Sequence, residues 1–162
     1  GFLRHVLVKR SFATGEIMVV LVTGTLEFPD EPKFINALLS RHPEITTIVQ
    51  NVNNKRTSLV LGEITKVLYG SGYIEDELLG CKFRISPKAF YQINPIQTEV
   101  LYGKALEFAK LTGNETVIDA YCGTGSIGIL ASKSAEKVIG VELNADAVKD
   151  AKVNAELNCV KR

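Results

Sequence analysis

The sequence predicts an α/β protein, with an α+β first half followed by the opening part of a parallel, doubly wound sheet. Two observations support this prediction. Up to about Ser86, short runs rich in Val, Ile and Leu alternate with turn residues, a pattern typical of strands joined by short loops. After Asn94 the pattern becomes helix, strand, helix, strand and helix with short connections, which is typical of parallel strands linked by crossover helices.

The chain begins with a predicted β-hairpin. Residues 3–10 and 16–23 are rich in β-prone side chains, and the connection 11–15 carries a glycine that suits a hairpin loop. A short amphipathic helix is predicted next, at 31–41, because its apolar residues recur at helical spacing. Asp30 is placed to act as the N-cap of this helix.

Further short strands are predicted in the rest of the first half, at 46–52, 58–61, 65–69, 73–79 and 82–86. We therefore expect this half to be built mainly on antiparallel strands. Taken alone, it is interpreted as a structural or RNA-presenting module without chemistry of its own.

The second half begins with a predicted helix capped by Asn94, whose first residue, Pro95, loses no hydrogen bond at that position. An apolar stripe is expected along this helix, and Gly113 is expected to end it. The stripe consists of Val100, Leu101, Ala105, Phe108 and Ala109. The remaining predicted elements are a buried strand at 116–120, a helix through about Ser132, a strand at 137–142 and a helix at 145–157.

Composition and charge narrow the possible classes of protein. No apolar stretch approaches the roughly 20 residues that a membrane-spanning helix needs, and the sequence carries no pattern typical of a secretion signal. The formal net charge is only +1, whereas proteins that bind RNA mainly through its phosphates usually carry a marked excess of basic residues. The cysteines are spaced too irregularly for a disulfide framework or a metal site, so we expect a cytoplasmic protein without a metal.

The most informative stretch is 117–128, where Gly123, Gly125 and Gly128 follow a predicted strand and open a helix. Glycines at such positions let the backbone turn sharply and let a ligand approach more closely than a Cβ atom would allow. This geometry fits two ligands: a dinucleotide whose pyrophosphate sits at the helix N-terminus, and S-adenosylmethionine.

Side chains beside this loop favour S-adenosylmethionine. Asp119 would repel a pyrophosphate but attract the cationic sulfonium ligand. Glu142 ends the next strand, where a carboxylate can accept hydrogen bonds from ribose hydroxyls, and Tyr121 can line the pocket. Structural alternatives stay open, with Asp119 as a helix cap or turn carboxylate, Glu142 as a solvated strand end and Tyr121 as a cover for the core.

Three ordered segments resemble the RNA (uracil-5-)-methyltransferase family. Residues 83–94 resemble the FxISPxxFxQxN signature that leads into the catalytic domain of that family. Residues 119–128 resemble its DxYCGTGxIG loop, and residues 140–155 resemble the block that follows. The resemblance is tight over about residues 80–158 and looser over the first half.

This resemblance implies a central domain over 1–80 and, over 81–162, the first part of a Rossmann-like class I methyltransferase domain with an incomplete parallel sheet. The parent protein is then expected to transfer a methyl group from S-adenosylmethionine to C5 of a uridine in rRNA or tRNA. The predicted cofactor-binding residues are Gln92, Asp119, Tyr121, Gly123, Gly125 and Glu142. Gln92 enters this set through the resemblance alone.

In the family, a cysteine adds to C6 of the uracil, C5 takes the methyl group, and a carboxylate removes the C5 proton. We expect this chain to be a fragment that stops before those residues, so no catalytic residue is assigned. Cys122 lies inside the cofactor loop, where the family's cysteine is not the nucleophile. The fragment is expected to bind the cofactor weakly and to form a homodimer through the edge of its truncated sheet. The alternatives are a non-catalytic RNA-binding or assembly module and an NAD-dependent oxidoreductase fragment.

Overall fold

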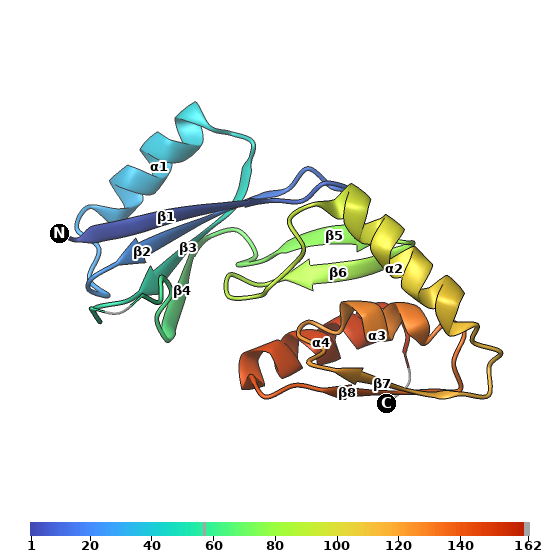
Figure 1. The fold of residues 1–162 in the computed structure, drawn as a ribbon. Helices are drawn as coiled ribbons and strands as arrows, with labels where there is room; N and C mark the ends of the chain where they lie inside the picture. The colour runs from blue at the N-terminus through green and yellow to red at the C-terminus, as the bar shows by residue number, and fades with distance from the viewer. Residues whose placement is uncertain (57, 161–162) are drawn as a thin grey trace. The chain divides into compact units, whose positions relative to one another are not determined.

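The computed structural model of the protein describes residues 1–56 and 58–160, which form two compact units (Figure 1). The first unit is Gly1–Ile74 and the second begins at Glu75. The interpretation of the two parts as a central domain and a methyltransferase domain stays a prediction.

The first unit is built on a four-stranded sheet with the strand order β1-β2-β3-β4. Its strands are β1 (Leu3–Arg10), β2 (Ile17–Thr23), β3 (Ile45–Val52) and β4 (Ile64–Tyr69). The predicted hairpin of β1 and β2 is confirmed, and β3 and β4 also pair antiparallel. However, β2 and β3 run parallel, with the helix α1 (Glu31–Arg41) in the connection between them. The prediction of a mainly antiparallel first half missed this βαβ unit.

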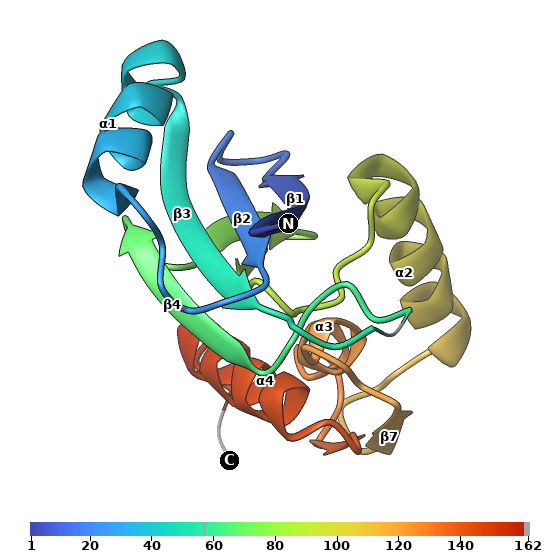
Figure 2. The same cartoon turned by 90° about the vertical axis from the view of Figure 1, so that its left-hand side faces the viewer.

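Helix α1 covers one face of this sheet (Figure 2). Ile35 of α1 is buried against side chains of β2 and β3, including Val19 and Ile48. The predicted bounds of α1 are confirmed, but Asp30 does not cap it through its side chain. Asp30 instead adopts a left-handed conformation with φ of 52°, and its side chain makes no capping hydrogen bond.

The strand predicted at 58–61 is wrong, because the described residues of this segment lie in an irregular loop between β3 and β4. Two buried amides at the end of β3 hold the loop. Asn51 Nδ2 donates to the carbonyl oxygens of Gly62 and Ile64, at 3.0 and 3.2 Å. Asn53 Nδ2 donates to the carbonyl oxygens of Leu59 and Val60, at 2.8 and 3.0 Å. Backbone groups that would pair in a strand therefore bond to side chains here.

The second unit contains a two-stranded antiparallel hairpin and a two-stranded parallel sheet with helices. The hairpin strands β5 (Ile74–Leu78) and β6 (Cys81–Ile85) are joined by Leu79 and Gly80, which both have positive φ, as a tight hairpin turn requires. The other elements are α2 (Pro95–Ala109), β7 (Thr116–Ala120), α3 (Ser126–Ala131), β8 (Lys137–Val141) and α4 (Ala145–Leu157). Their order and the parallel pairing of β7 with β8 confirm the sequence prediction.

Helix α2 turns a different face to the core than predicted. Asn94 caps it as expected, accepting a hydrogen bond from the Gln97 N–H at 3.2 Å. Yet the predicted apolar stripe is exposed, and the residues that pack against the core are Tyr102 and Leu106. The helix also ends before Gly113, with Lys110 in the left-handed conformation at its C-cap.

Strand β7 is not buried as predicted. The helix α3 lies against one face of the β7–β8 sheet, where Asp119 is buried. The opposite face presents Ile118, Ile139 and Val141, of which Ile118 is 66% exposed. Ile118 and Ile139 are direct partners in the parallel register, so these two side chains and Val141 form one continuous, solvent-exposed apolar surface. We name this surface the open sheet face.

Candidate functional site

The glycine-rich loop connects β7 to α3 and takes several left-handed backbone conformations in succession. Tyr121, Gly123 and Gly125 have φ values of 61°, 55° and 80°. The Cys122 N–H donates to the carbonyl oxygen of Val141 at 3.0 Å, which fastens the loop to the end of β8. The positive φ of Tyr121 is an unfavourable backbone conformation for a residue with a side chain. The Tyr121 side chain is 92% exposed, so the ring does not cover the core.

The glycines of the loop have different surroundings. A Cβ atom at Gly123 would meet nothing within 4 Å, so this position faces open space. A Cβ atom at Gly125 would lie 3.2 Å from the Ala151 Cβ, and one at Gly128 would lie 2.8 Å from Asp119 Oδ2. Gly125 and Gly128 therefore permit close packing of α3 against α4 and β7. Only Gly123 leaves room for a ligand to approach the backbone.

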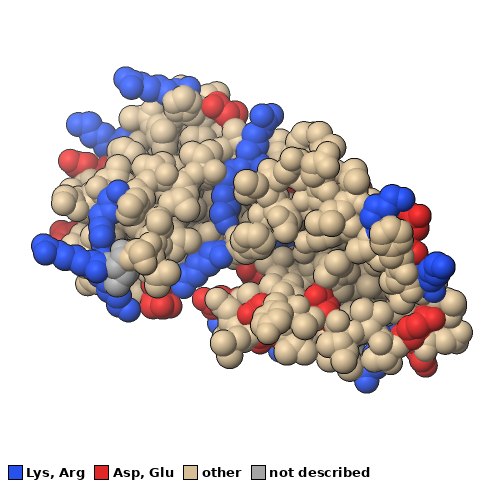
Figure 3. Space-filling view, viewed as in Figure 1, with Lys and Arg blue, Asp and Glu red and all other residues tan. Residues whose placement is uncertain are grey.

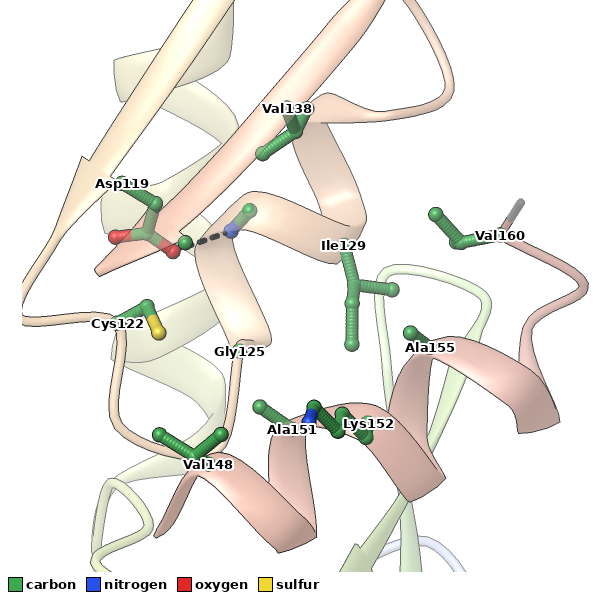
Figure 4. Close-up of a pocket in the computed structure, with 12 residues that line it drawn as sticks. Asp119, Cys122, Gly125, Ile129, Val138, Val148, Ala151, Lys152, Ala155 and Val160 are labelled. Carbon is green, nitrogen blue, oxygen red and sulfur yellow. Dashed lines mark hydrogen bonds between the residues drawn. The ribbon is translucent and has the colours of Figure 1, made fainter. Parts of the chain in front are cut away.

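The Asp119 carboxylate is hydrogen-bonded to the first turn of α3. Its Oδ2 accepts a hydrogen bond of 2.8 Å from the Gly128 N–H (Figure 4). Burial raises the pKa of this carboxyl group, and the Gly128 N–H partly opposes that effect. This arrangement matches the structural alternative of a helix-capping carboxylate, while the predicted attraction of Asp119 for the cofactor stays a prediction.

Glu142 follows β8 and bridges two backbone segments. Its Oε2 accepts a hydrogen bond from the Gly123 N–H at 3.0 Å, and its Oε1 accepts one from the Asn144 N–H at 2.8 Å. These backbone N–H groups, that of Asn144 first, lower the pKa of Glu142 and keep the carboxylate ionised. Each oxygen retains lone-pair capacity for another donor. Glu142 therefore presents a charged acceptor beside the open space at Gly123.

The thiol of Cys122 lies in a partly buried, negatively charged environment. Burial raises the pKa of its thiol, and the negative charges of Asp119 and Glu142 raise it further. The thiolate form that attacks carbon is thereby disfavoured. A Cβ atom at Gly140 would lie 3.1 Å from the Cys122 sulfur, so this side chain packs closely on β8.

The predicted residues come from three segments of the second unit. Hydrogen bonds bring Gly123 and Glu142 together, and Asp119 and Gly125 lie at the two ends of the same loop. The Gly125 N–H already donates to the carbonyl oxygen of Cys122 at 2.8 Å. Gln92 is half-buried in the irregular segment between β6 and α2. The roles of all six residues in cofactor binding stay predictions.

Asn154 is a fully buried residue of α4 that contacts this loop, and the sequence predicted no role for it. Its Nδ2 donates to the carbonyl oxygen of Thr124 at 3.1 Å. The available signal was Asn154 itself, since an asparagine in a helix interior disfavours the helix unless its amide has specific partners.

A cavity of about 240 Å³ lies between α3, α4 and β8 (Figure 4). Figure 4 shows Ile129, Val138, Val148 and Ala155 pointing into it. Tyr121, Gly123 and Glu142 are not among its lining residues. Two of the predicted cofactor residues, Asp119 and Gly125, do line it, and the Asp119 carboxylate is already bonded to the Gly128 N–H. Because its walls are mainly apolar and Glu142 is not part of them, we do not assign it to the polar cofactor.

Neither a cluster of metal ligands nor a membrane-spanning helix occurs within residues 1–56 and 58–160. No group of His, Cys, Asp and Glu side chains there is arranged to hold a metal ion. Among the same residues, no helix is both long enough and apolar enough to cross a membrane.

Comparisons with known proteins show extensive sequence similarity. The family model for ribosomal protein L11 methyltransferase (PrmA) matches residues 97–162. A Bacillus cereus protein described as an RNA methyltransferase is 54% identical over 158 residues, covering 98% of this chain and 34% of that protein. One from Oceanobacillus iheyensis, also described as an RNA methyltransferase, is 49% identical with the same coverage. The chain thus spans about a third of the length of the curated relatives that it matches.

Solved structures agree with this similarity. The tRNA (uracil-54, C5)-methyltransferase of Pyrococcus abyssi, solved in complex with S-adenosyl-L-homocysteine, matches with a TM-score of 0.80 and 29% identity. The match covers 99% of this chain and 38% of that one. The M. jannaschii tRNA m1G37 methyltransferase matches with a TM-score of 0.53 and 18% identity, over 99% of this chain and 45% of that one, which shows a shared fold alone.

Proposed function

We propose, from the premise that this chain is homologous to RNA methyltransferases along nearly all of its length, that it forms the S-adenosylmethionine-binding part of a uridine-modifying enzyme. The reaction is methyl transfer to C5 of a uridine in rRNA or tRNA. The 29% identity to a tRNA uracil C5-methyltransferase supports this choice of base and atom. So do the FxISPxxFxQxN and DxYCGTGxIG motifs at 83–94 and 119–128.

One observation carries the proposal, namely the hydrogen bond between Glu142 and the Gly123 N–H. It brings an ionised acceptor to a backbone position where no side chain or neighbouring atom fills the space. A ribose with two adjacent hydroxyls can donate to the two oxygens of such a carboxylate. The open position at Gly123 then admits the adenosyl group beside the loop.

The other predicted residues complete the proposed pocket. Bound S-adenosylmethionine supplies the methyl group on its positively charged sulfur. Asp119, whose pKa is raised by burial, favours its ionised form when a cationic ligand lies nearby. The exposed ring of Tyr121 is free to lie against the ligand, and Gln92 supplies a polar side chain from the segment before α2. Gly125, also proposed to bind the cofactor, keeps the loop close to α4, because a side chain there would meet Ala151.

We place the nucleophilic cysteine in a part of the full-length protein that this chain does not contain. The raised pKa of Cys122 supports this, because its thiol is a poor nucleophile where it lies. The three-fold greater length of the relatives leaves ample sequence for the catalytic residues.

A nicotinamide dinucleotide fits less well. A pyrophosphate at the start of α3 needs free backbone N–H groups, and the Gly128 N–H there is already bonded to the Asp119 carboxylate. The negative charge of Asp119 would also repel the phosphates.

RNA is the proposed substrate of the full-length protein. Figure 3 shows Lys and Arg side chains distributed over the first unit, interspersed with Asp and Glu. With a formal net charge of +1, most of the affinity for RNA is expected to come from other parts of the protein. We propose a cytoplasmic location, where such RNA is found.

Calorimetric titration with S-adenosyl-L-homocysteine tests the cofactor site in the full-length protein. Glu142→Ala should weaken binding by roughly 10- to 100-fold, the value of one or two hydrogen bonds to a charged group. Glu136→Ala is the matched control, because Glu136 is an exposed carboxylate of the same unit in the turn before β8. It should leave the affinity unchanged.

Transfer of a tritiated methyl group to RNA transcripts, followed by nucleoside analysis, tests the reaction. The expected product is 5-methyluridine. Methylation at another atom or base would refute the proposed chemistry while leaving the cofactor site intact. Salt-sensitive RNA binding by a protein that does not bind S-adenosyl-L-homocysteine would favour the non-catalytic alternative.

A further inference from the structure

Helix α4 is joined to β6 and the residues after it by a regular series of side-chain contacts. Asn158 accepts from the Lys82 N–H at 2.9 Å and donates to the Lys82 carbonyl oxygen at 2.7 Å. One turn earlier, Asn154 accepts from the Arg84 N–H at 2.7 Å and donates to the Arg84 carbonyl oxygen at 3.3 Å. Each amide therefore binds one backbone residue of β6 as a neighbouring strand would.

The series continues beyond β6. Asp150 accepts a hydrogen bond of 2.6 Å from the Ser86 hydroxyl, and Asp146 forms an ion pair of 3.3 Å with Lys88. Every fourth residue of α4 thus contacts every second residue of the other segment. We name these four contacts the α4–β6 ladder. Four helical residues rise about 6 Å and two strand residues about 6.6 Å, so the two spacings match closely.

Asn154 differs from the other members of the ladder, because it also reaches the glycine-rich loop. Its Nδ2 donates to the carbonyl oxygen of Thr124 at 3.1 Å as well as to Arg84. Thr124 directly follows Gly123, whose N–H is held by Glu142. A single buried amide thereby joins β6, α4 and the loop. The contacts of Asn158 stay on β6 and within α4 itself.

The segment that β6 leads into contains Gln92. The turn at Ser86 is held by Asp150, and the Ala89 N–H donates to the Ser86 carbonyl oxygen at 3.2 Å. The α4–β6 ladder therefore fixes the start of the segment between β6 and α2 relative to α4. Asn154 fixes the position of the glycine-rich loop relative to α4 and β6. A shift of Asn154 would move the loop and the segment before α2 apart.

We propose that Asn154 is a positioning residue for cofactor binding, which aligns the Gly123 loop with the segment that carries Gln92. This inference rests on the proposed function, because the two segments it aligns are those assigned to the S-adenosylmethionine pocket. Asn154 does not touch the cofactor in this proposal. It acts through Thr124 on the loop and through Arg84 on β6.

The test compares Asn154→Ala with Asn158→Ala in the full-length protein. Each variant loses a side-chain amide that connects α4 to β6, so the melting temperature of each should be lower than that of the wild type. Only Asn154→Ala loses the contact with Thr124, and it should weaken the binding of S-adenosyl-L-homocysteine at least about tenfold. Asn158→Ala should stay within about twofold of the wild type, since its bonds do not reach the loop.

Equal losses of affinity in the two variants, in proportion to their losses of stability, would overturn the inference and leave a structural role for both amides. Failure of the wild-type protein to bind S-adenosyl-L-homocysteine would instead refute the proposed function, and the positioning role with it. The two failures are therefore distinguishable.

Hydrogen–deuterium exchange of the wild-type protein provides a second test, which does not depend on the folding of Asn154→Ala. Adding S-adenosyl-L-homocysteine should slow exchange of the Arg84 amide, which is bonded to Asn154, more than that of the Lys82 amide, which is bonded to Asn158. Equal protection of the two amides would contradict the coupling of β6 to the loop through Asn154.

Discussion

At the scale of single residues, Gly123 and Gly125 have similar backbone conformations and different surroundings. An Ala at either position adopts an unfavourable positive φ, which costs about 1–2 kcal/mol. At Gly125 the new methyl group also meets Ala151 and Ile129, and this overpacking adds about 1–3 kcal/mol.

We therefore expect Gly125→Ala to lower the free energy of unfolding by roughly 2–5 kcal/mol. Gly123→Ala should lower it only by the cost of the positive φ, about 1–2 kcal/mol. Urea denaturation measures both. Gly113→Ala is the control for the backbone part, since Gly113 has a φ of 94° and open surroundings. In contrast, Gly123→Ala should weaken the binding of S-adenosyl-L-homocysteine more than Gly113→Ala does. Equal stabilities of the Gly123 and Gly125 variants would show that the packing against Ala151 is not tight.

Glu142 makes stability depend on pH in a defined direction. Its folded-state pKa lies below the ordinary value of 4.5, because the Asn144 and Gly123 N–H groups bond to the ionised form. The unfolded chain therefore takes up this proton first as the pH falls. The stabilising contribution is complete above the ordinary pKa and disappears as the pH falls through the lower, folded-state pKa.

The free energy of unfolding, measured in urea between about pH 6 and pH 3, should fall more steeply for the wild type than for Glu142→Gln. Glu115, whose pKa is lowered to about 2 by its hydrogen bonds with Thr112, contributes equally to both proteins and cancels in the comparison. Parallel curves for the two proteins would mean that Glu142 does not bond to the backbone in its ionised form. Asp119 acts in the opposite direction, since its raised pKa favours the folded state at low pH.

At the scale of secondary-structure elements, the ends of helices α1 and α4 differ. Asn144 caps α4, with its Oδ1 accepting from the Asp146 and Ala147 N–H groups at 2.9 and 3.2 Å. Asp30 at α1 makes no such bond and has a left-handed backbone. Asn144→Ala should lower the free energy of unfolding by about 1 kcal/mol.

Asp30→Gly should be neutral or raise stability by up to about 1 kcal/mol, because glycine adopts this backbone conformation without strain. Chemical denaturation of the two variants measures the difference between them. A loss of stability in Asp30→Gly equal to that in Asn144→Ala would indicate that Asp30 does cap α1 in solution.

Most elements could be predicted from the sequence because their local signals agree with their tertiary environment. The bounds of α1, β7 and α4 are those predicted, since periodicity and end signals coincide there. The segment 58–61 has β-prone residues, but the Asn53 amide donates hydrogen bonds to the carbonyl oxygens of Leu59 and Val60, which a strand would use for pairing. Helix α2 has apolar residues on more than one face, so periodicity alone could not decide that Tyr102 and Leu106 face inward.

The candidate site was predictable in part for a similar reason. A glycine-rich loop after one strand and an acidic residue after the next lie together in any parallel βαβ unit, which brought Gly123 and Glu142 into one prediction. Which glycine packs and which stays open depends on Ala151, a residue from a distant helix. The role of Asn154 likewise depends on the approach of β6, which the sequence of α4 does not reveal.

At the scale of the whole molecule, the open sheet face is the least typical feature for a globular protein. Ile118, Ile139 and Val141 expose apolar side chains on a sheet of only two strands, whose outer edges carry backbone groups available for pairing. Such surfaces promote association. We propose that the 162-residue chain forms homodimers through the edge of this sheet, with the open sheet face beside that edge covered in the dimer.

Sedimentation should show an average mass that rises with concentration for this chain. Ile118→Lys should shift the protein toward the monomer, because a charge within a paired apolar surface is costly to bury. Leu59→Lys is the control, since Leu59 is 70% exposed but lies in the loop of the first unit. A mass that stays that of the monomer at all concentrations would contradict the proposed homodimer.

The α4–β6 ladder also bears on how this protein can change in evolution. Its contacts run from Lys82 to Lys88 on one side and from Asp146 to Asn158 on the other, and they depend on two matched repeats. Inserting or deleting one residue in either stretch would turn the following side chains away from their partners. Alignments of related sequences should therefore place their gaps outside both stretches, even where the residues themselves vary.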